Sequence, residues 1–449
     1  MRRVVFACMS VVLATAAACA SSEHDVLAPA PERDSGTAVV PDAEAPIDAR
    51  SDATTDAPSC SPSGWCPTTL PDTNLTLRDI SVLPGRAFAV AESPNLGVKV
   101  LEWAESAASW SYIDDNTQNE SGRGAYVGKI WSPNENEIYF TVAPHTVYHG
   151  KRNLGAPPQQ KSWTWTSQQL ESRIPAYDSP GMDYFPNHYF GRPKSSATNS
   201  EFTALGVFGT SAGDVYAWYG NAIYHLASDA AGNAAWVVEY VADDLDRDDE
   251  QLFFLGATAT GQNELWFVGG RGGSVWDSRN CAIVVTKRLG EYRRIADATA
   301  QMGGGFPPLP AKCEARAGTI LVDSATGWLT DVLATSGSTV VALNGGRNIA
   351  RISSNGGAYS VEASPIPRVR AWDESAYLSM WTAPGQPLWL GGLKLVVQNK
   401  DVWGAGEYEI SSISLNGGWL NAAIYQIRGS SDLDLWAVGA GYALHKTTP

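Results

Sequence analysis

An acidic run at residues 243–250 could supply oxygen ligands to a divalent cation. Asp244, Asp246 and Asp248 alternate along it, as the ligands of calcium-binding loops do. Such loops place a glycine at the sixth position and a bidentate acid at the twelfth, but this sequence has aspartate and leucine there. Two interpretations stay open, a calcium site at these three residues or a solvated acidic turn, and we expect no other cofactor or metal.

A second candidate site is rich in aromatic rings. Aromatic side chains with polar tips suit carbohydrate, peptide or protein surfaces. Within residues 171–201 the candidate ligand-binding side chains are Tyr177, Tyr184, Phe185, His188, Tyr189 and Phe190. They predict a platform for a glycan or protein ligand whose identity the sequence does not name. The alternative is a small satellite core that packs this segment onto its scaffold.

The cysteines indicate an oxidising compartment. Of the six, one lies in the N-terminal apolar segment and one directly follows it, which leaves four. Sequence proximity suggests the disulfides Cys60–Cys66 and Cys281–Cys313, although four cysteines allow three pairings. A zinc site is not expected, because the sequence has no CxxC pair and no histidine at ligand spacing from a cysteine.

Catalytic signatures are weak throughout the sequence. It has no HExxH pattern, and GGRGG at 269–273 follows a strand and opens no helix. We therefore name no catalytic residue and expect a binding protein. A glycan-active hydrolase or lyase is the alternative, if carboxylates from distant loops converge. The net charge of −15 argues against nucleic acid as a partner.

The N-terminal residues indicate export. Residues 1–18 have a basic start and an apolar core too short for a stable membrane span, which is typical of a signal peptide. Three alanines precede Cys19, and this resembles the bacterial lipoprotein signal, in which the cysteine is lipidated; Ala16 replaces the usual leucine. The alanine that follows Cys19 implies, by the same resemblance, the outer membrane or cell surface. Ordinary cleavage would instead give a secreted or periplasmic protein.

The next segment, residues 19–61, predicts a disordered acidic tether. It is rich in Ala, Pro and Asp and shows no hydrophobic periodicity, so it cannot bury enough apolar surface to offset its ordering entropy.

From residue 62 onward, one pattern recurs seven times. An alternating apolar run, a Gly/Ser/Pro/Asn turn and a second apolar-aromatic strand are followed by a third and usually a fourth strand. Aligning the second strands places one residue of each copy in a column: Phe88, Tyr139, Tyr216, Trp266, Val341, Trp389 and Trp436. Four strands per unit, repeated about every fifty residues, are typical of a β-propeller blade.

The seventh copy ends at Lys446 after only three strands. Residues 63–70, with Trp65, have the pattern of the missing fourth strand, and a ring leaves no open edge when its last blade is completed. We therefore expect an all-β fold, with residues 62–449 as one seven-bladed propeller closed by the N-terminal strand. A six- or eight-bladed ring, or a pair of β-sandwiches, is the alternative.

Both long insertions of this repeat, 171–201 and 299–327, fall in connections from a fourth strand to the next first strand. Such connections share one face of a propeller, so a Cys281–Cys313 bridge would pin the second insertion to the face on which we expect ligand. His149, His225 and His445 recur at equivalent third-strand positions. This repetition favours hydrogen bonds within or between blades over metal binding.

The strand LWAVG at 435–439, with the looser forms LWFVGG and VYAWYG, resembles uncharacterised β-propeller-repeat lipoproteins of myxobacterial type. In that family a lipidated cysteine and an acidic Ala/Pro tether also precede the repeats. The resemblance implies an outer-membrane or cell-surface binding protein that touches the membrane only through its N-terminal lipid, and it carries no catalytic residues. We expect a monomer.

Overall fold

The computed structural model describes residues 60–120, 126–155, 162–173, 204–228, 230–246, 250–261, 264–272, 280–301, 311–367, 377–415 and 418–448. The chain divides into two compact units, residues 1–55 and 56–449, and all described residues belong to the second. The predicted signal peptide, Cys19 and residues 19–59 of the predicted tether lie outside the described residues. Within the described part, no helix has the length and apolar character that a membrane-spanning helix needs.

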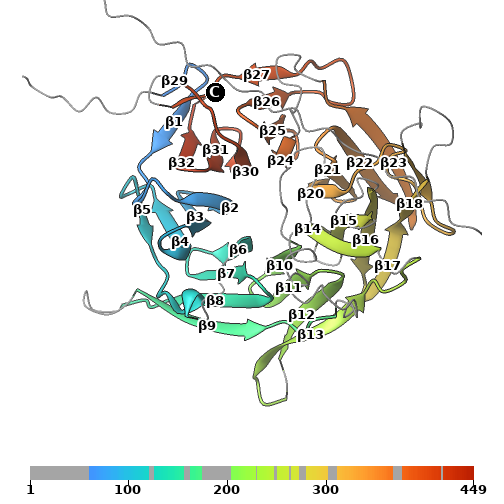
Figure 1. The fold of residues 1–449 in the computed structure, drawn as a ribbon, viewed down its shortest axis with the longest axis horizontal. Helices are drawn as coiled ribbons and strands as arrows, with labels where there is room; N and C mark the ends of the chain where they lie inside the picture. The colour runs from blue at the N-terminus through green and yellow to red at the C-terminus, as the bar shows by residue number, and fades with distance from the viewer. Residues whose placement is uncertain are drawn as a thin grey trace, which may run out of the picture. The chain divides into compact units, whose positions relative to one another are not determined.

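The described residues form seven four-stranded antiparallel sheets, which follow one another around a ring as the blades of a propeller (Figure 1). From the centre outward, the strands of blades 1 to 3 are β2 (Thr76–Leu83), β3 (Arg86–Ser93), β4 (Gly97–Ala104) and β5 (Ser109–Tyr112); β6 (Val127–Asn134), β7 (Glu137–Val142), β8 (Thr146–Arg152) and β9 (Trp163–Gln169); β10 (Leu205–Ser211), β11 (Asp214–Tyr219), β12 (Ala222–Ser228) and β13 (Ala234–Val241).

In the same order, the strands of blades 4 to 7 are β14 (Gln251–Gly261), β15 (Glu264–Gly272), β16 (Asn280–Arg288) and β17 (Glu291–Ala296); β20 (Leu329–Ser336), β21 (Thr339–Asn344), β22 (Asn348–Asn355) and β23 (Ala358–Pro365); β24 (Tyr377–Trp381), β25 (Leu388–Gly392), β26 (Val396–Asn399) and β27 (Glu409–Ser411); β30 (Ile424–Ser431), β31 (Asp434–Gly439), β32 (Tyr442–Lys446) and β1 (Trp65–Thr68). Outside the blades lie β18 (Ala298–Gln301), β19 (Lys312–Ala315), β28 (Ser414–Leu415), β29 (Gly418–Trp419) and one 3-10 turn, Thr117–Asn119.

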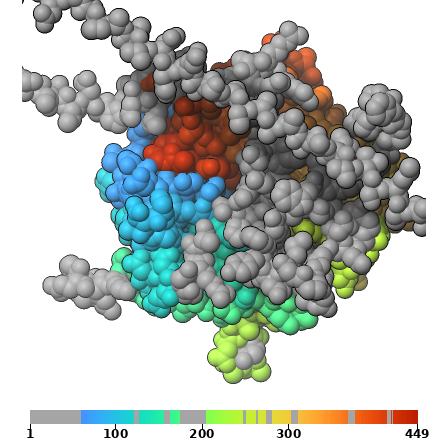
Figure 2. Space-filling view, viewed as in Figure 1, coloured from blue at the N-terminus to red at the C-terminus, as the bar shows by residue number. Residues whose placement is uncertain are grey.

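The ring closes through its N-terminal strand, as the sequence predicts. β1 pairs antiparallel with β32, with Trp65 opposite Lys446 and Thr68 opposite Ala443. Trp65 is fully buried, and its Nε1 donates to Ser411 Oγ at 2.9 Å. The blue N-terminal residues therefore lie directly against the red C-terminal residues in Figures 1 and 2. This pairing gives the last blade its fourth strand, so β32 has a partner strand on both sides.

The fold reaches slightly further toward the N-terminus than the predicted start at residue 62. Cys60 and Cys66 form a disulfide with an S–S distance of 2.05 Å, which confirms this predicted pairing. Ser61 is buried; its backbone N–H donates to the Trp65 carbonyl at 2.8 Å, and its Oγ accepts from the Trp65 N–H at 3.2 Å. These contacts fix the register of the closing strand β1 at its N-terminal end.

The aligned second-strand residues form one packing column, as predicted. They lie in β3, β7, β11, β15, β21, β25 and β31, and each is at most 5% exposed. In four seams between blades the column ring meets an aromatic ring from the outer strand of the next blade. These pairs are Phe88–Trp163 at 5.9 Å, Trp266–Tyr359 at 5.8 Å, Trp389–Trp65 at 6.0 Å and Trp436–Trp110 at 5.3 Å. The column residues therefore pack neighbouring blades against each other.

Candidate functional site

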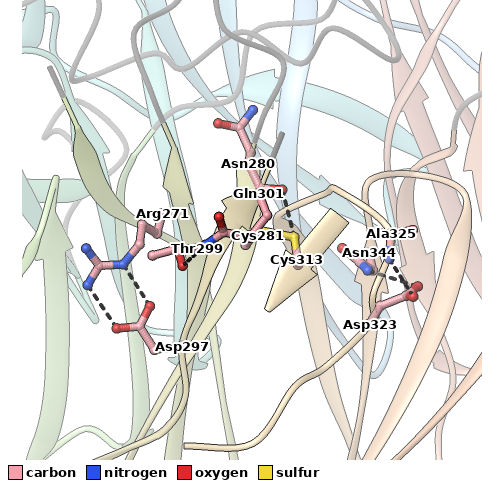
Figure 3. Close-up of a disulfide and its surroundings, with 10 residues drawn as sticks. All are labelled: Arg271, Asn280, Cys281, Asp297, Thr299, Gln301, Cys313, Asp323, Ala325 and Asn344. Carbon is pink, nitrogen blue, oxygen red and sulfur yellow. Dashed lines mark hydrogen bonds and ion pairs between the residues drawn. A yellow bond between two sulfur atoms is a disulfide. The ribbon is translucent and has the colours of Figure 1, made fainter. Parts of the chain in front are cut away.

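The second predicted insertion is fastened to blade 4 on the expected face. It leaves β17 and returns to β20, so it is a fourth-to-first connection, and it carries the hairpin β18–β19. Cys281 of β16 and Cys313 of β19 form a buried disulfide with an S–S distance of 2.02 Å (Figure 3). This confirms the predicted pairing and the predicted attachment of the insertion beside a second-to-third connection of the same blade.

The insertion is also tied to blade 5. Asp323 accepts a hydrogen bond from the Ala325 backbone N–H at 2.9 Å and one from Asn344 Nδ2 at 3.4 Å (Figure 3). Asn348 of β22 also donates to Asp323. The segment 311–328 is therefore anchored at both ends, by a covalent bond to blade 4 and by hydrogen bonds to blade 5.

Arg271 stands at the centre of a buried ion-pair cluster on the same face. It lies near the end of β15, and its side chain is 1% exposed. The guanidinium donates to Asp297 from Nε at 2.8 Å and from Nη2 at 2.9 Å (Figure 3), and from Nη1 to Glu250 at 2.7 Å. Asp297 directly follows β17, where the chain enters the insertion, and Glu250 lies at the end of the connection from blade 3 to blade 4. The side chain of Arg271 therefore joins three segments of the chain.

Two further arginines complete this cluster, which we call the arginine clamp. Arg294 Nη1 donates to the two oxygens of Asp244 at 2.6 and 2.7 Å and to Asp297 at 2.9 Å. Arg316, from the insertion itself, contacts Asp297 and Asp244, each at 3.4 Å. It also donates to Asp246.

The electrostatics of the clamp are those of a structural network. Burial alone would raise the pKa of Asp244, but the hydrogen bonds and charge of Arg294, with Arg271 behind them, lower it below its ordinary value. A glycosidase acid needs the opposite shift, because it must hold a proton near neutral pH. The clamp therefore fastens the insertion, and the lowered pKa of Asp244 does not suit this residue to the role of such an acid.

The predicted calcium ligands Asp244 and Asp246 both belong to this clamp, whereas Asp248 lies outside the described residues. Among the residues that the structure describes, no group of three or more His, Cys, Asp or Glu side chains is placed to hold a metal ion. The calcium site stays an untested prediction, and two of its three carboxylates already face guanidinium groups.

The histidines repeat one arrangement in three blades, and this confirms the expected hydrogen-bonding role. Each imidazole lies flat on the column ring of its own blade and contacts an acid two residues before that ring. The contacts are His149 with Glu137 at 2.7 Å, His225 with Asp214 at 3.1 Å and His445 with Asp434 at 2.8 Å. The stacked partners are Tyr139, Tyr216 and Trp436, with centroid distances of 4.1, 4.4 and 4.0 Å.

Charged side chains on the innermost strands link different blades around the centre of the ring. Arg428 of β30 donates to both carboxylate oxygens of Asp331 of β20, at 2.8 and 3.0 Å. Asp331 also accepts from the Met380 backbone N–H at 3.1 Å, and Asp79 of β2 accepts in the same way from Ile130 at 2.8 Å. Burial would lower the pKa of Arg428, but Asp331 outweighs it and raises that pKa. These charges hold first strands together.

The predicted aromatic platform cannot be placed. All six candidate ligand-binding residues of 171–201 fall within 174–203, outside the described residues. Two sets of side chains that matter were missed by the sequence reasoning. The acids that contact the histidines could have been found from the sequence, because each lies two residues before the aromatic column residue of its blade. Arg271 also had one, as the lone charge in the segment GGRGG.

Comparisons with known proteins support the fold alone. No family model matches the sequence, and no curated protein matches it. The structure of YCF48 bound to D1 peptide is similar, with a TM-score of 0.52 and 14% identity, over 88% of this chain and all of that one. YCF48 from Cyanidioschyzon merolae has a TM-score of 0.50 and 11% identity, over 86% of this chain and 99% of that one. The chain is thus a β-propeller whose relatives in structure share little of its sequence.

Proposed function

We propose that this protein is an exported binding propeller that engages a protein ligand on the face carrying the two insertions. The observation that carries the proposal is the fixed position of the segment 311–328. A disulfide, the arginine clamp and hydrogen bonds to blade 5 hold it on the propeller. A loop held rigidly on a scaffold loses little entropy on binding, which favours a recognition surface.

Two further points support a protein ligand. Propellers commonly serve as interaction scaffolds, and the similar propeller YCF48 has been solved with a D1 peptide. The other predicted insertion, 171–201, joins a fourth strand to the next first strand and has the six candidate residues whose rings suit such a contact. A glycan ligand on this face is the alternative outcome of the test.

The ligand face can be tested with peptides selected from a displayed random library against the full chain. Residues 174–203 are replaced by a Gly-Ser linker in the test variant, and the turn 230–233 on the opposite face is replaced in the control. We expect most selected peptides to lose binding to the test variant and to keep it with the control. Equal binding to both variants would refute the assigned face, and binding of arrayed glycans without peptides would change the ligand class.

We also propose that Cys19 carries a lipid that anchors the protein in the outer membrane or at the cell surface. The support is the signal-like segment 1–18, the small residues before Cys19 and the two disulfides, which fit an oxidising compartment. Cells fed labelled palmitate should label the protein, and Cys19→Ala should abolish the label and release the protein. A label that persists in the variant would contradict the anchor.

A further inference from the structure

One blade departs from the packing column. Of the seven column positions, all of them described, six carry an aromatic ring and blade 5 carries Val341. The ring of a blade fills the seam toward the next blade, as Trp266 does against Tyr359 at 5.8 Å. A valine in this position leaves the space of a ring between blades 5 and 6 that the side chain cannot fill.

The structure has a groove at this place, with a volume of about 560 Å³. We call it the seam groove. Its walls include the connections β20–β21, β24–β25 and β26–β27, so it opens on the face opposite the insertions. Val341, Leu388 and Asn399 are buried at 5%, 5% and 2% exposure and belong to its lining. Its volume lies within the range of about 300–1,000 Å³ that small-ligand sites occupy.

The third-strand histidine that repeats in blades 2, 3 and 7 is also replaced in blade 5. Arg351 pairs across the strands with Val341, which is the position that histidine holds opposite the column ring in blades 2, 3 and 7. Its guanidinium reaches across the seam and lies over the ring of Trp403, 4.5 Å from the centroid. Arg351 thus links the two walls of the groove through a cation–π contact.

The loop that carries Trp403 is held by a buried polar residue. Asn399 Oδ1 accepts from the Asp401 backbone N–H at 2.7 Å, and its Nδ2 donates to the Gly406 carbonyl at 3.2 Å. These bonds shape the turn that places the partly exposed indole of Trp403 on the groove wall. The wall is therefore built before any ligand arrives, which lowers the entropy cost of binding.

The remaining lining is polar and balanced in charge. Hydroxyl and amide side chains predominate, and they are Thr335, Ser336, Thr339, Ser353, Ser360, Thr382, Gln386 and Asn399. The charged residues are two cations, Arg351 and Lys400, and two anions, Glu362 and Asp401, and Arg351 forms an ion pair with Glu362. A site for an anionic ligand would need a surplus of cations, which this groove does not have.

We propose that the seam groove binds a neutral oligosaccharide. Hydroxyl and amide side chains match the hydroxyl groups of a sugar as donors and acceptors, and an indole packs against the apolar face of a pyranose ring. A peptide would need apolar pockets or a free strand edge, whereas the buried apolar lining here is limited to Val341, Ile349 and Leu388. This site is separate from the proposed protein-binding face.

Two variants test the groove against short neutral oligosaccharides of glucose, mannose, xylose, galactose or N-acetylglucosamine, titrated by calorimetry into the full chain. Trp403→Ala removes the indole, and Val341→Trp restores the missing ring and fills the groove. Tyr112→Ala is the matched control, because Tyr112 is also a partly exposed ring with a cation–π contact, to Lys99 at 5.3 Å.

We expect at least one saccharide to bind the wild type with a Kd of about 0.1–1 mM, and each test variant to weaken it by about tenfold or more. The control should change it by less than about twofold. Val341→Trp should keep or raise the Tm, which separates loss of binding from loss of folding. If that variant does not fold, the effect of Trp403→Ala on saccharide binding is the test of the groove. The variant without 174–203 should bind saccharide normally, so failure of the proposed protein-binding face leaves this result intact.

Two results would overturn the proposal. One is the absence of binding to the wild type by every saccharide at about 10 mM. The other is binding that neither Trp403→Ala nor Val341→Trp weakens. Selected peptides that lose binding to Val341→Trp, in the absence of any bound saccharide, would assign the groove to peptides and equally overturn it.

Discussion

The arginine clamp makes a quantitative prediction about Arg271→Met. The substitution keeps the length of the buried side chain and removes the charge that faces Asp297 and Glu250. Removing one partner of a buried ion pair costs about 3–5 kcal/mol, because the other charge stays buried and uncompensated. Asp297 is 1% exposed but keeps Arg294 at 2.9 Å and Arg316 at 3.4 Å. We therefore expect the lower end of that range, about 3 kcal/mol.

Urea unfolding measures this loss, and hydrogen exchange localises it. Amides in 297–301 and 311–320 should exchange faster in Arg271→Met, because this side chain holds the insertion, while the distant β3 and β4 stay protected. The control is Arg351→Met, since Arg351 and Glu362 form a pair with side chains 36% and 52% exposed. Such a pair contributes about 0–1 kcal/mol, and the cation–π contact of Arg351 with Trp403 adds about 0.5–1 kcal/mol, so the control should lose at most about 2 kcal/mol. A loss for Arg271→Met no larger than that of the control, with unchanged exchange in the insertion, would refute the clamp.

Three other perturbations test separate parts of the fold. Replacing Cys281 and Cys313 together by serine should cost about 4 kcal/mol, because the bridge closes a loop over a separation of 32 residues; urea unfolding measures it. Trp65→Ala should cost about 3–5 kcal/mol in the same assay, since it empties a fully buried site in the closing strand. Burial lowers the pKa of His149 below 6.5 despite the opposing contact with Glu137, so its stabilising contribution is present above about pH 6.5 and is lost as the pH falls. Melting curves should therefore show that the Tm of His149→Gln falls less between pH 7 and pH 5 than the Tm of the wild type. This pH range spans the ordinary histidine pKa of about 6.5.

Each of these three has an outcome that contradicts it. Serine variants as stable as the wild type would mean that the bridge does not constrain the unfolded chain. A Trp65→Ala protein with unchanged unfolding would mean that the N-terminal strand does not close the ring in solution. Parallel pH curves for His149→Gln and the wild type would mean that this imidazole is not held in its neutral form.

Much of the scaffold could be predicted from the sequence because each blade repeats the same local pattern. The column position was visible in all seven copies, and the missing strand of the last copy led directly to Trp65. Both disulfides followed from proximity along the chain and from the expected face of the insertion. Patterns of this kind are local, so one sequence is enough to find them.

The sites were harder to predict because they join segments that are distant in sequence. Arg271 meets Asp297 and Glu250 only after β15, the insertion and the preceding connection fold together. Val341 was visible in the column as a residue without a ring, but its consequence depends on Trp403, which comes from the next blade. Asp244 and Asp246, two acids of the run that suggested calcium, form ion pairs with arginines, and spacing along the chain alone does not show which cations come near.

The most direct test of this account is a crystal structure of Val341→Trp beside that of the wild type. The column residue of each blade decides whether the seam to the next blade is filled. The introduced indole should enter the seam toward Trp403 and fill the groove, with the backbones of β21 and β27 in place. An indole turned out to solvent, with the groove open and unchanged, would contradict it.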